Sequence, residues 1–206
     1  MSEENKTEAK ANTIPEKIEF YIKSDTLNAH MLAFSQDKTR IALYKSINFR
    51  CKGDGLLHIA STDGRVLFHT IINDCNTKPL PEFDKTFQFD RSVKSSKKSY
   101  PNLFIVIDGD VMRIHGLGID IPQLFPMRCE YDKFPNYEMV EINSKDWCAP
   151  TVKTFKPEIL EKVAKYVPSG YLTPHDNLGD PSGARCFVEE EGGVTKIATV
   201  MPMRVV

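Results

Sequence analysis

Thr199-Val200-Met201-Pro202-Met203-Arg204-Val205 is the stretch on which the fold assignment of this 206-residue chain depends. Its apolar, β-prone start predicts a strand that stops at the proline, because proline cannot donate to a sheet ladder. The two methionines can adapt to apolar partners of varied shape. Two further stretches must be read with it, Ser61-Thr62-Asp63-Gly64-Arg65-Val66-Leu67 and Asp132-Lys133-Phe134-Pro135-Asn136-Tyr137. Taken singly, the terminal stretch is an ordinary strand that closes a sheet.

The composition is typical of a soluble globular protein, with 41% hydrophobic residues, 27% charged residues and a formal net charge of -1. A nucleic-acid role must therefore rest on a local basic patch. No apolar run reaches the roughly 20 residues that a transmembrane helix needs, and residues 1–12 lack the apolar core of a secretory signal. No C-x-x-C spacing occurs among the cysteines, which are Cys51, Cys75, Cys129, Cys148 and Cys186. We expect reduced, partly buried thiols in a cytoplasmic protein, without a metal or cofactor.

The order of elements repeats along the chain as strand, helix and then antiparallel strands. The first copy is predicted as a strand at residues 18–22, a helix that Ser24 or Asp25 can cap, and strands at 44–51, 56–60 and 65–72. The last copy is predicted as a strand at 152–155, a helix opened by Pro157, and strands at 185–189 and 195–201. A degenerate copy between them has predicted strands at 86–89, 103–107, 111–115 and 127–131. This repetition predicts an α+β fold with helices on one face of curved antiparallel sheets.

Three local features complete the prediction. The first helix places Leu27, Met31 and Phe34 on one face, which we expect to be buried, with His30 off that face. Residues 173–183 are rich in turn-forming residues and are predicted as a loop. Residues 1–15 are polar and are predicted as a disordered tail.

Together these stretches resemble the bacterial DNA polymerase sliding clamp, the beta subunit of the replicative polymerase. Residues 17–67 are similar to the start of the family's middle domain, and residues 132–140 to its D-G-x-F-P-D-Y-x-x-V segment. Residues 155–204 are similar to the second half of the last domain, which closes on V-M-P-M-R. The resemblance implies the DNA-clamp architecture in a shortened, phage- or mobile-element-like version. It divides the chain into a tail (1–15), a clamp-like domain (16–149) and a C-terminal half-domain (150–206).

The resemblance implies a pocket that captures short linear motifs of polymerases and their partners. Apolar side chains there would hold the Leu or Phe anchors of an extended peptide, and Arg204 would bind a polar or carboxylate group at the rim. Carried over position by position, the pocket comprises Thr62, Gly64, Arg65, Val66, Leu67, Pro135, Met139, Val140, Thr199, Met201, Pro202, Met203, Arg204 and Val205. Asn136 stands where the family has Asp, and Glu138 and Met139 replace basic residues.

The resemblance also implies non-specific phosphate contacts to double-stranded DNA from basic residues on helices that line a ring. The candidate positions are Lys23, His30, Lys38, Arg40, Arg91, Lys94, Lys97, Lys98, Lys153, Lys156, Lys162 and Lys165. Residues 91–98 hold four basic residues and no acid, and are the best single patch. For any one lysine, a solvated surface charge is the simpler interpretation.

The sequence contains no P-loop, dinucleotide fingerprint or G-x-S-x-G motif, and we expect no enzyme. One hypothesis is a homo-oligomeric processivity factor that encircles DNA, tethers a DNA polymerase and has a clamp loader as a further candidate partner, without membrane association. Another is a non-encircling adaptor or clamp mimic that binds clamp-interacting proteins. A third is an unrelated α+β interaction domain whose motifs match by chance.

Overall fold

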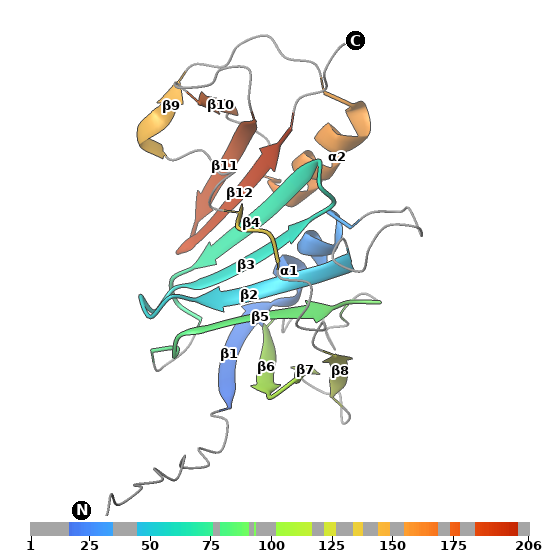
Figure 1. The fold of residues 1–206 in the computed structure, drawn as a ribbon, viewed down its shortest axis with the longest axis vertical. Helices are drawn as coiled ribbons and strands as arrows, with labels where there is room; N and C mark the ends of the chain where they lie inside the picture. The colour runs from blue at the N-terminus through green and yellow to red at the C-terminus, as the bar shows by residue number, and fades with distance from the viewer. Residues whose placement is uncertain are drawn as a thin grey trace, which may run out of the picture.

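The computed structural model describes residues 17–34, 45–75, 79–90, 93, 102–116, 122–126, 134–137, 144–148, 155–168, 174–177 and 184–201. Within these ranges the chain forms two antiparallel sheets and two α-helices (Figure 1). No helix of these ranges is long and apolar enough to cross a membrane. The α+β prediction, with helices on one side of antiparallel sheets, is confirmed.

The smaller sheet has the strand order β1-β6-β7-β8. Its strands are β1 (Ile18–Lys23), β6 (Asn102–Asp108), β7 (Val111–Gly116) and β8 (Gln123–Pro126). Buried and exposed residues alternate along β1, as in a strand with one face on the core. Gly109 has a φ of 58°, which gives the tight turn between β6 and β7 that its Asp-Gly pair predicts.

The larger sheet has the strand order β5-β2-β3-β4-β12-β11-β10-β9. Its strands are β2 (Ser46–Cys51), β3 (Leu57–Thr62), β4 (Val66–Ile72), β5 (Phe83–Gln88), β9 (Trp147–Cys148), β10 (Pro174–Asn177), β11 (Arg185–Glu191) and β12 (Val194–Val200). β4 pairs antiparallel with β12 along their whole lengths. This pairing joins strands from the N-terminal and C-terminal parts of the chain in one continuous sheet.

Both helices, α1 (Ser24–Met31) and α2 (Pro157–Tyr166), lie behind the larger sheet in the view of Figure 1. Pro157 occupies the first turn of α2, as predicted. The buried face of α2 carries Ile159, Val163 and Tyr166, at the spacing of one helical stripe. A short 3₁₀ helix, η3 (Ser144–Asp146), precedes β9.

The main hydrophobic core lies between the two sheets and under α1. It is rich in aromatic side chains, and the ring of Phe20 contacts those of Phe49 and Phe83. A second cluster lies between the larger sheet and α2. The thiols of Cys51, Cys75 and Cys186 are buried, as expected, and that of Cys148 is partly exposed.

Several sequence predictions need correction. His30 is completely buried and not off the apolar face of α1. The N-cap residue of α1 is Lys23, which makes no side-chain cap, so neither Ser24 nor Asp25 has the predicted role. β10 lies within residues 173–183, which we expected to be a loop, and β8 and β9 were not expected.

Some predictions lie outside the described residues: the tail at 1–15, the strand at 127–131 and residues 152–154 of another strand. Phe155, the last residue of that second strand prediction, is in coil. The division of the chain after residue 149 stays a prediction.

Candidate peptide-binding site

The turn between β3 and β4 is held by its own side chains. The Thr62 hydroxyl donates to the Val66 carbonyl at 2.8 Å and accepts from the Gly64 N–H at 2.9 Å. Asp63 Oδ1 accepts from the N–H groups of Arg65 at 2.9 Å and Val66 at 3.0 Å. Gly64 has a φ of 83°, a left-handed conformation that favours glycine. The sequence T-D-G therefore encodes this turn locally.

The end of β12 lies beside this turn. The N–H of Met201 donates to the carbonyl of Arg65 at 3.0 Å. Thr199 is the cross-strand partner of Leu67, two rows further into the sheet. Met201 is 48% exposed, a large apolar side chain at the surface next to the exposed Arg65. Two of the three sequence motifs are thus neighbours in space.

The third motif, residues 134–137, crosses the face of β4 and β3 opposite the helices (Figure 1). Tyr137 is only 3% exposed and packs with Ala60 and Leu67. Its ring centroid lies 4.8 Å from that of His69 on β4. Phe134 packs against the same cluster, while Pro135 is exposed. All three motifs therefore meet on the internal strands β3, β4 and β12 of the larger sheet.

Thr199 is a polar group on this same face. Cross-strand partners project to the same side of a sheet, so its side chain shares the face of Leu67. Thr199 is 2% exposed, and within the described part of the chain its hydroxyl oxygen has no hydrogen-bond partner. Burying an unpaired hydroxyl is unfavourable by about 1–3 kcal/mol. A ligand group that reached this hydroxyl would recover part of that loss.

A pair of histidines lies next to Tyr137 on the same face of β3 and β4. His58 Nδ1 and His69 Nε2 are 3.0 Å apart, and the two rings stack at 5.2 Å. Burial lowers the pKa of His58, the nearby His69 lowers it further, and the carboxylate of Asp54 acts in the opposite direction. His58 is therefore neutral near pH 7. Sequence reasoning did not assign this pair to the site, because only strand register brings the two rings together.

The structure brings together eight of the predicted pocket positions. They are Thr62, Gly64, Arg65, Val66, Leu67, Pro135, Thr199 and Met201. Val66 differs from the others, because its side chain packs in the cluster beneath α2 and not on the opposite face. Met139, Val140, Pro202, Met203, Arg204 and Val205 lie outside the described residues.

The residues predicted to contact DNA differ in their exposure and in their ion-pair partners. Lys23 and Lys156 are exposed at the N-terminal ends of α1 and α2. Lys165 is exposed and pairs with Glu161 at 2.6 Å. His30 is buried, and burial lowers its pKa to about 3, so its assignment as a DNA contact is wrong. Lys38, Arg40, Arg91, Lys94, Lys97, Lys98 and Lys153 lie outside the described residues.

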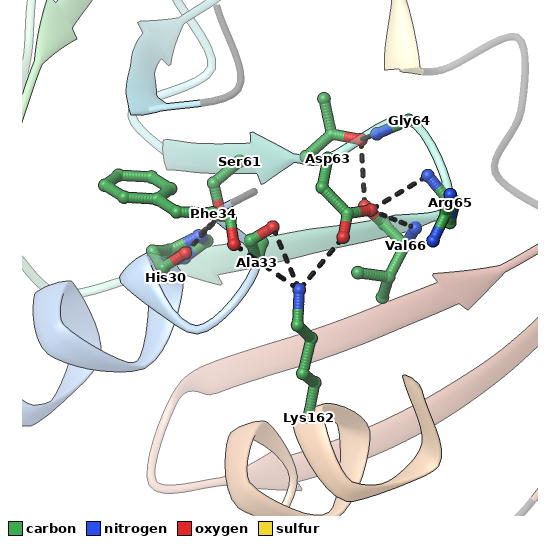
Figure 2. Close-up of polar contacts among 10 residues, drawn as sticks. His30, Ala33, Phe34, Ser61, Asp63, Gly64, Arg65, Val66 and Lys162 are labelled. Carbon is green, nitrogen blue, oxygen red and sulfur yellow. Dashed lines mark hydrogen bonds and ion pairs between the residues drawn. The ribbon is translucent and has the colours of Figure 1, made fainter. Parts of the chain in front are cut away.

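Lys162 projects from α2 toward the T-D-G turn (Figure 2). Its Nζ lies 2.9 Å from Asp63 Oδ2. The same ammonium approaches the carbonyl oxygens of Ala33 at 3.5 Å and Phe34 at 3.4 Å, just beyond the end of α1. Lys162 therefore links α2 to the β3–β4 turn and to the segment after α1, an arrangement that its sequence position did not reveal.

Comparisons with solved structures identify this arrangement of sheets. The beta clamp of H. pylori, solved with diflunisal, is 11% identical with a TM-score of 0.64, over 94% of this chain and 68% of that chain. The beta subunit of the Streptococcus pyogenes DNA polymerase is 10% identical with a TM-score of 0.65, over 97% of this chain and 69% of that chain. The DNA polymerase III beta subunit of Thermotoga maritima is 10% identical with a TM-score of 0.60, over 91% and 65%.

The chain has the fold of the bacterial DNA polymerase sliding clamps, as the three motifs predict. It spans about two thirds of the length of these proteins. No family model matches the sequence, and a search of the curated proteins finds no match. At such low identity the likeness concerns the fold.

Proposed function

We propose that this protein is a shortened sliding clamp. In this proposal it captures linear motifs of a DNA polymerase and other partners on the surface where the three motifs meet. It assembles as a homo-oligomer, encircles double-stranded DNA in the cytoplasm and contacts its phosphates without sequence preference. A clamp loader is a further candidate partner, and catalysis is not part of the proposed role.

The observation that carries the proposal is the convergence of three distant motifs. The Met201 N–H bonds to the Arg65 carbonyl, and Tyr137 packs on Leu67. In the sliding-clamp family that this chain resembles, the same three stretches, in the same order, form the pocket that binds linear motifs of partner proteins. An unrelated α+β domain would have no reason to gather them on neighbouring strands of one sheet.

The chemistry of these residues suits an extended peptide with apolar anchors. Met201 offers a flexible, half-exposed apolar surface that can adapt to a Leu or Phe side chain. Arg65 is exposed next to it and can pair with a carboxylate of the peptide. The Thr199 hydroxyl adds one polar group on the same face of the sheet as Leu67.

Peptide binding tests the proposal directly. A fluorescent peptide with Leu and Phe anchors, of the type that binds sliding clamps, should bind the wild-type chain in an anisotropy titration. Met201→Asp should weaken binding about tenfold or more, equivalent to about 1.4 kcal/mol, because it places a charge against an apolar anchor. Removal of residues 201–206 should abolish binding.

Leu124→Asp is the matched control, since Leu124 on β8 is 53% exposed, much like Met201 at 48%. It should bind the peptide like the wild-type chain. Equal affinities for wild-type, Met201→Asp and truncated chains would remove the peptide-binding claim.

A specific observation favours the second candidate, a non-encircling adaptor. Two of the cations expected to face DNA, Lys162 and Lys165, are engaged in ion pairs with Asp63 and Glu161. These pairs reduce the positive field that α2 presents to phosphates. The adaptor would keep the peptide-binding surface and bind clamp-interacting proteins without a ring.

A further inference from the structure

The ammonium group of Lys162 has a complete set of acceptors. A lysine has three N–H donors, and three oxygens surround this one, Asp63 Oδ2, the Ala33 carbonyl and the Phe34 carbonyl. The two carbonyls follow the C-terminus of α1, where the helix dipole is negative and favours a cation. The Lys162 side chain is 24% exposed and that of Asp63 11%, so water screens the pair only in part.

The two oxygens of the Asp63 carboxylate have separate partners (Figure 2). Oδ2 receives Lys162, while Oδ1 receives the N–H groups of Arg65 and Val66. A single side chain thus connects α2 with the backbone of the β3–β4 turn. The connection is long-range, because Lys162 and Asp63 are 99 positions apart in sequence.

The connection continues to the exposed edge of the candidate site. Asp63 Oδ1 accepts the N–H of Val66, which belongs to the same peptide unit as the Arg65 carbonyl, and that carbonyl accepts the N–H of Met201. Any movement of Asp63 would move the peptide unit that holds the end of β12. A series of hydrogen bonds thus runs from Lys162 on α2 through Asp63 and the Arg65–Val66 peptide unit to Met201.

We propose that Lys162 is a positioning residue for the peptide-binding site. It fixes the β3–β4 turn against both helices and so sets where Arg65 and Met201 stand. This inference rests on the proposed function for its biological meaning, but the positioning itself can be measured in the free protein. It assigns to Lys162 a task other than the DNA contact that its sequence position indicates.

Two substitutions remove the connection from opposite sides. Lys162→Met keeps most of the side-chain length and removes the charge. Asp63→Asn keeps an oxygen for the N–H groups of Arg65 and Val66, but turns an amide NH₂ toward the ammonium, where two donors face each other. Because both variants retain the apolar core, we expect cooperative unfolding and unchanged sheet content by circular dichroism.

Amide hydrogen exchange measures the positioning without any ligand. In Lys162→Met the amides of Gly64, Arg65, Val66 and Met201 should exchange at least tenfold faster than in the wild-type chain. The amides of Phe49 and Ile59, in the sheet core, should keep their rates. Lys165→Met is the matched control, because Lys165 is on the same helix and its ion pair is exposed; it should change none of these rates.

Peptide affinity measures the consequence. Lys162→Met and Asp63→Asn should each weaken peptide binding about tenfold, and the double variant should bind no worse than either single one, since all three break the same connection. Thr70→Val serves as a destabilised control. It breaks a different helix–sheet contact, the 2.6 Å bond between Thr70 and Tyr166, and should lower stability without weakening the peptide complex.

The outcomes separate this inference from the proposed function. Unchanged exchange at Met201 and Arg65 in Lys162→Met overturns the positioning role, whether or not peptide binds. Equal peptide affinity in the wild-type chain and in Lys162→Met overturns the positioning role as well. A loss of peptide affinity in Thr70→Val as large as that in Lys162→Met also overturns it. Failure of the wild-type chain to bind the peptide counts against the proposed function, while the exchange rates still decide the role of Lys162.

Discussion

At the scale of single residues, His30 shows how a buried polar group can be fully satisfied. The Ser61 hydroxyl donates to the His30 carbonyl, so its oxygen accepts from Nδ1–H of the ring at 2.9 Å. Nε2 then accepts from Thr70 at 2.9 Å, and Thr70 accepts from Tyr166 at 2.6 Å. Counting donors and acceptors assigns this tautomer. The network needs a neutral ring.

This requirement predicts a loss of stability in acid. Burial, with smaller effects of His69 and Lys196, lowers the pKa of His30 from 6.5 to about 3. The unfolded chain binds a proton below its pKa of 6.5 and the folded chain does not, so stability is full above pH 6.5 and falls as the pH drops toward about 3. Urea unfolding should give a free energy about 2 kcal/mol lower at pH 5 than at pH 7.5, at about 1.4 kcal/mol per pH unit below 6.5.

His30→Gln is the control for this prediction, because glutamine also offers one donor and one acceptor. It should lose most of the pH dependence, with a remainder from His58, whose pKa is also lowered. Equal pH dependence in the variant and the wild-type chain would mean that His30 is not the titrating group.

Residue roles were only partly predictable from the sequence. The T-D-G turn was predictable, because its hydrogen bonds link neighbouring residues and glycine supplies the left-handed φ. The roles of Lys162 and His30 were not predictable. Their partners, Asp63 and Thr70, come from distant positions, and only tertiary structure shows that these side chains are engaged.

At the scale of elements, α2 is held on the sheet by one aromatic contact above all. The Tyr166 ring stacks on Phe68 of β4 with centroids 4.0 Å apart and an interplanar angle of 2°. Its hydroxyl bonds to Thr70 on the same strand at 2.6 Å. The last turn of α2 is thus bound to β4 by both an apolar and a polar contact.

Substitutions at Tyr166 separate these two contacts. Tyr166→Phe removes the hydroxyl and should lower the free energy of unfolding by about 1 kcal/mol. Tyr166→Ala also leaves a cavity against Phe68 and should lower it by about 3–5 kcal/mol. Urea denaturation measures both, with Lys165→Ala, at an exposed neighbour, expected within about 0.5 kcal/mol of wild type. Equal losses for the Phe and Ala variants would contradict a stabilising role of the stacked ring.

Elements with strong local patterns were predictable, and the others were not. Alternation identified β1, and the Asp-Gly turn identified the β6–β7 hairpin. β9 is two residues long and β10 begins with a proline, so neither has enough alternating positions to be recognised. Both strands form through pairing within the sheet, because β10 pairs with β11 and β9 pairs with β10.

At the scale of the whole molecule, the order of three motifs predicted the fold better than any single one. Each motif is short, but the three in this order resemble the sliding-clamp family, and that resemblance implies a fold that brings them together; in the structure β12 pairs with β4. The extent of the site could not be predicted in the same way. Whether the Val66 side chain lies on the face of Leu67 or on the face of α2 depends on strand register, and the structure places it against α2.

The proposed ring makes a prediction about mass in solution. Because the chain spans about two thirds of the clamps that it matches, a closed ring requires several copies. Light scattering behind a sizing column should give one multiple of 23.4 kDa that is stable to dilution. A monomer at all concentrations, also with DNA present, would contradict encirclement by a self-assembled ring and favour the adaptor.

The pairing of β4 with β12 also matters while the protein is being made. β4 leaves the ribosome long before β12, so the nascent chain presents an edge whose N–H and C=O groups await their partners. Open strand edges are templates for pairing with other chains, and pairings between distant segments form slowly. Chains being synthesised on the same messenger RNA therefore expose the same unpaired strand edge to one another. Binding of chaperones to this edge should matter most before the C-terminal strands emerge.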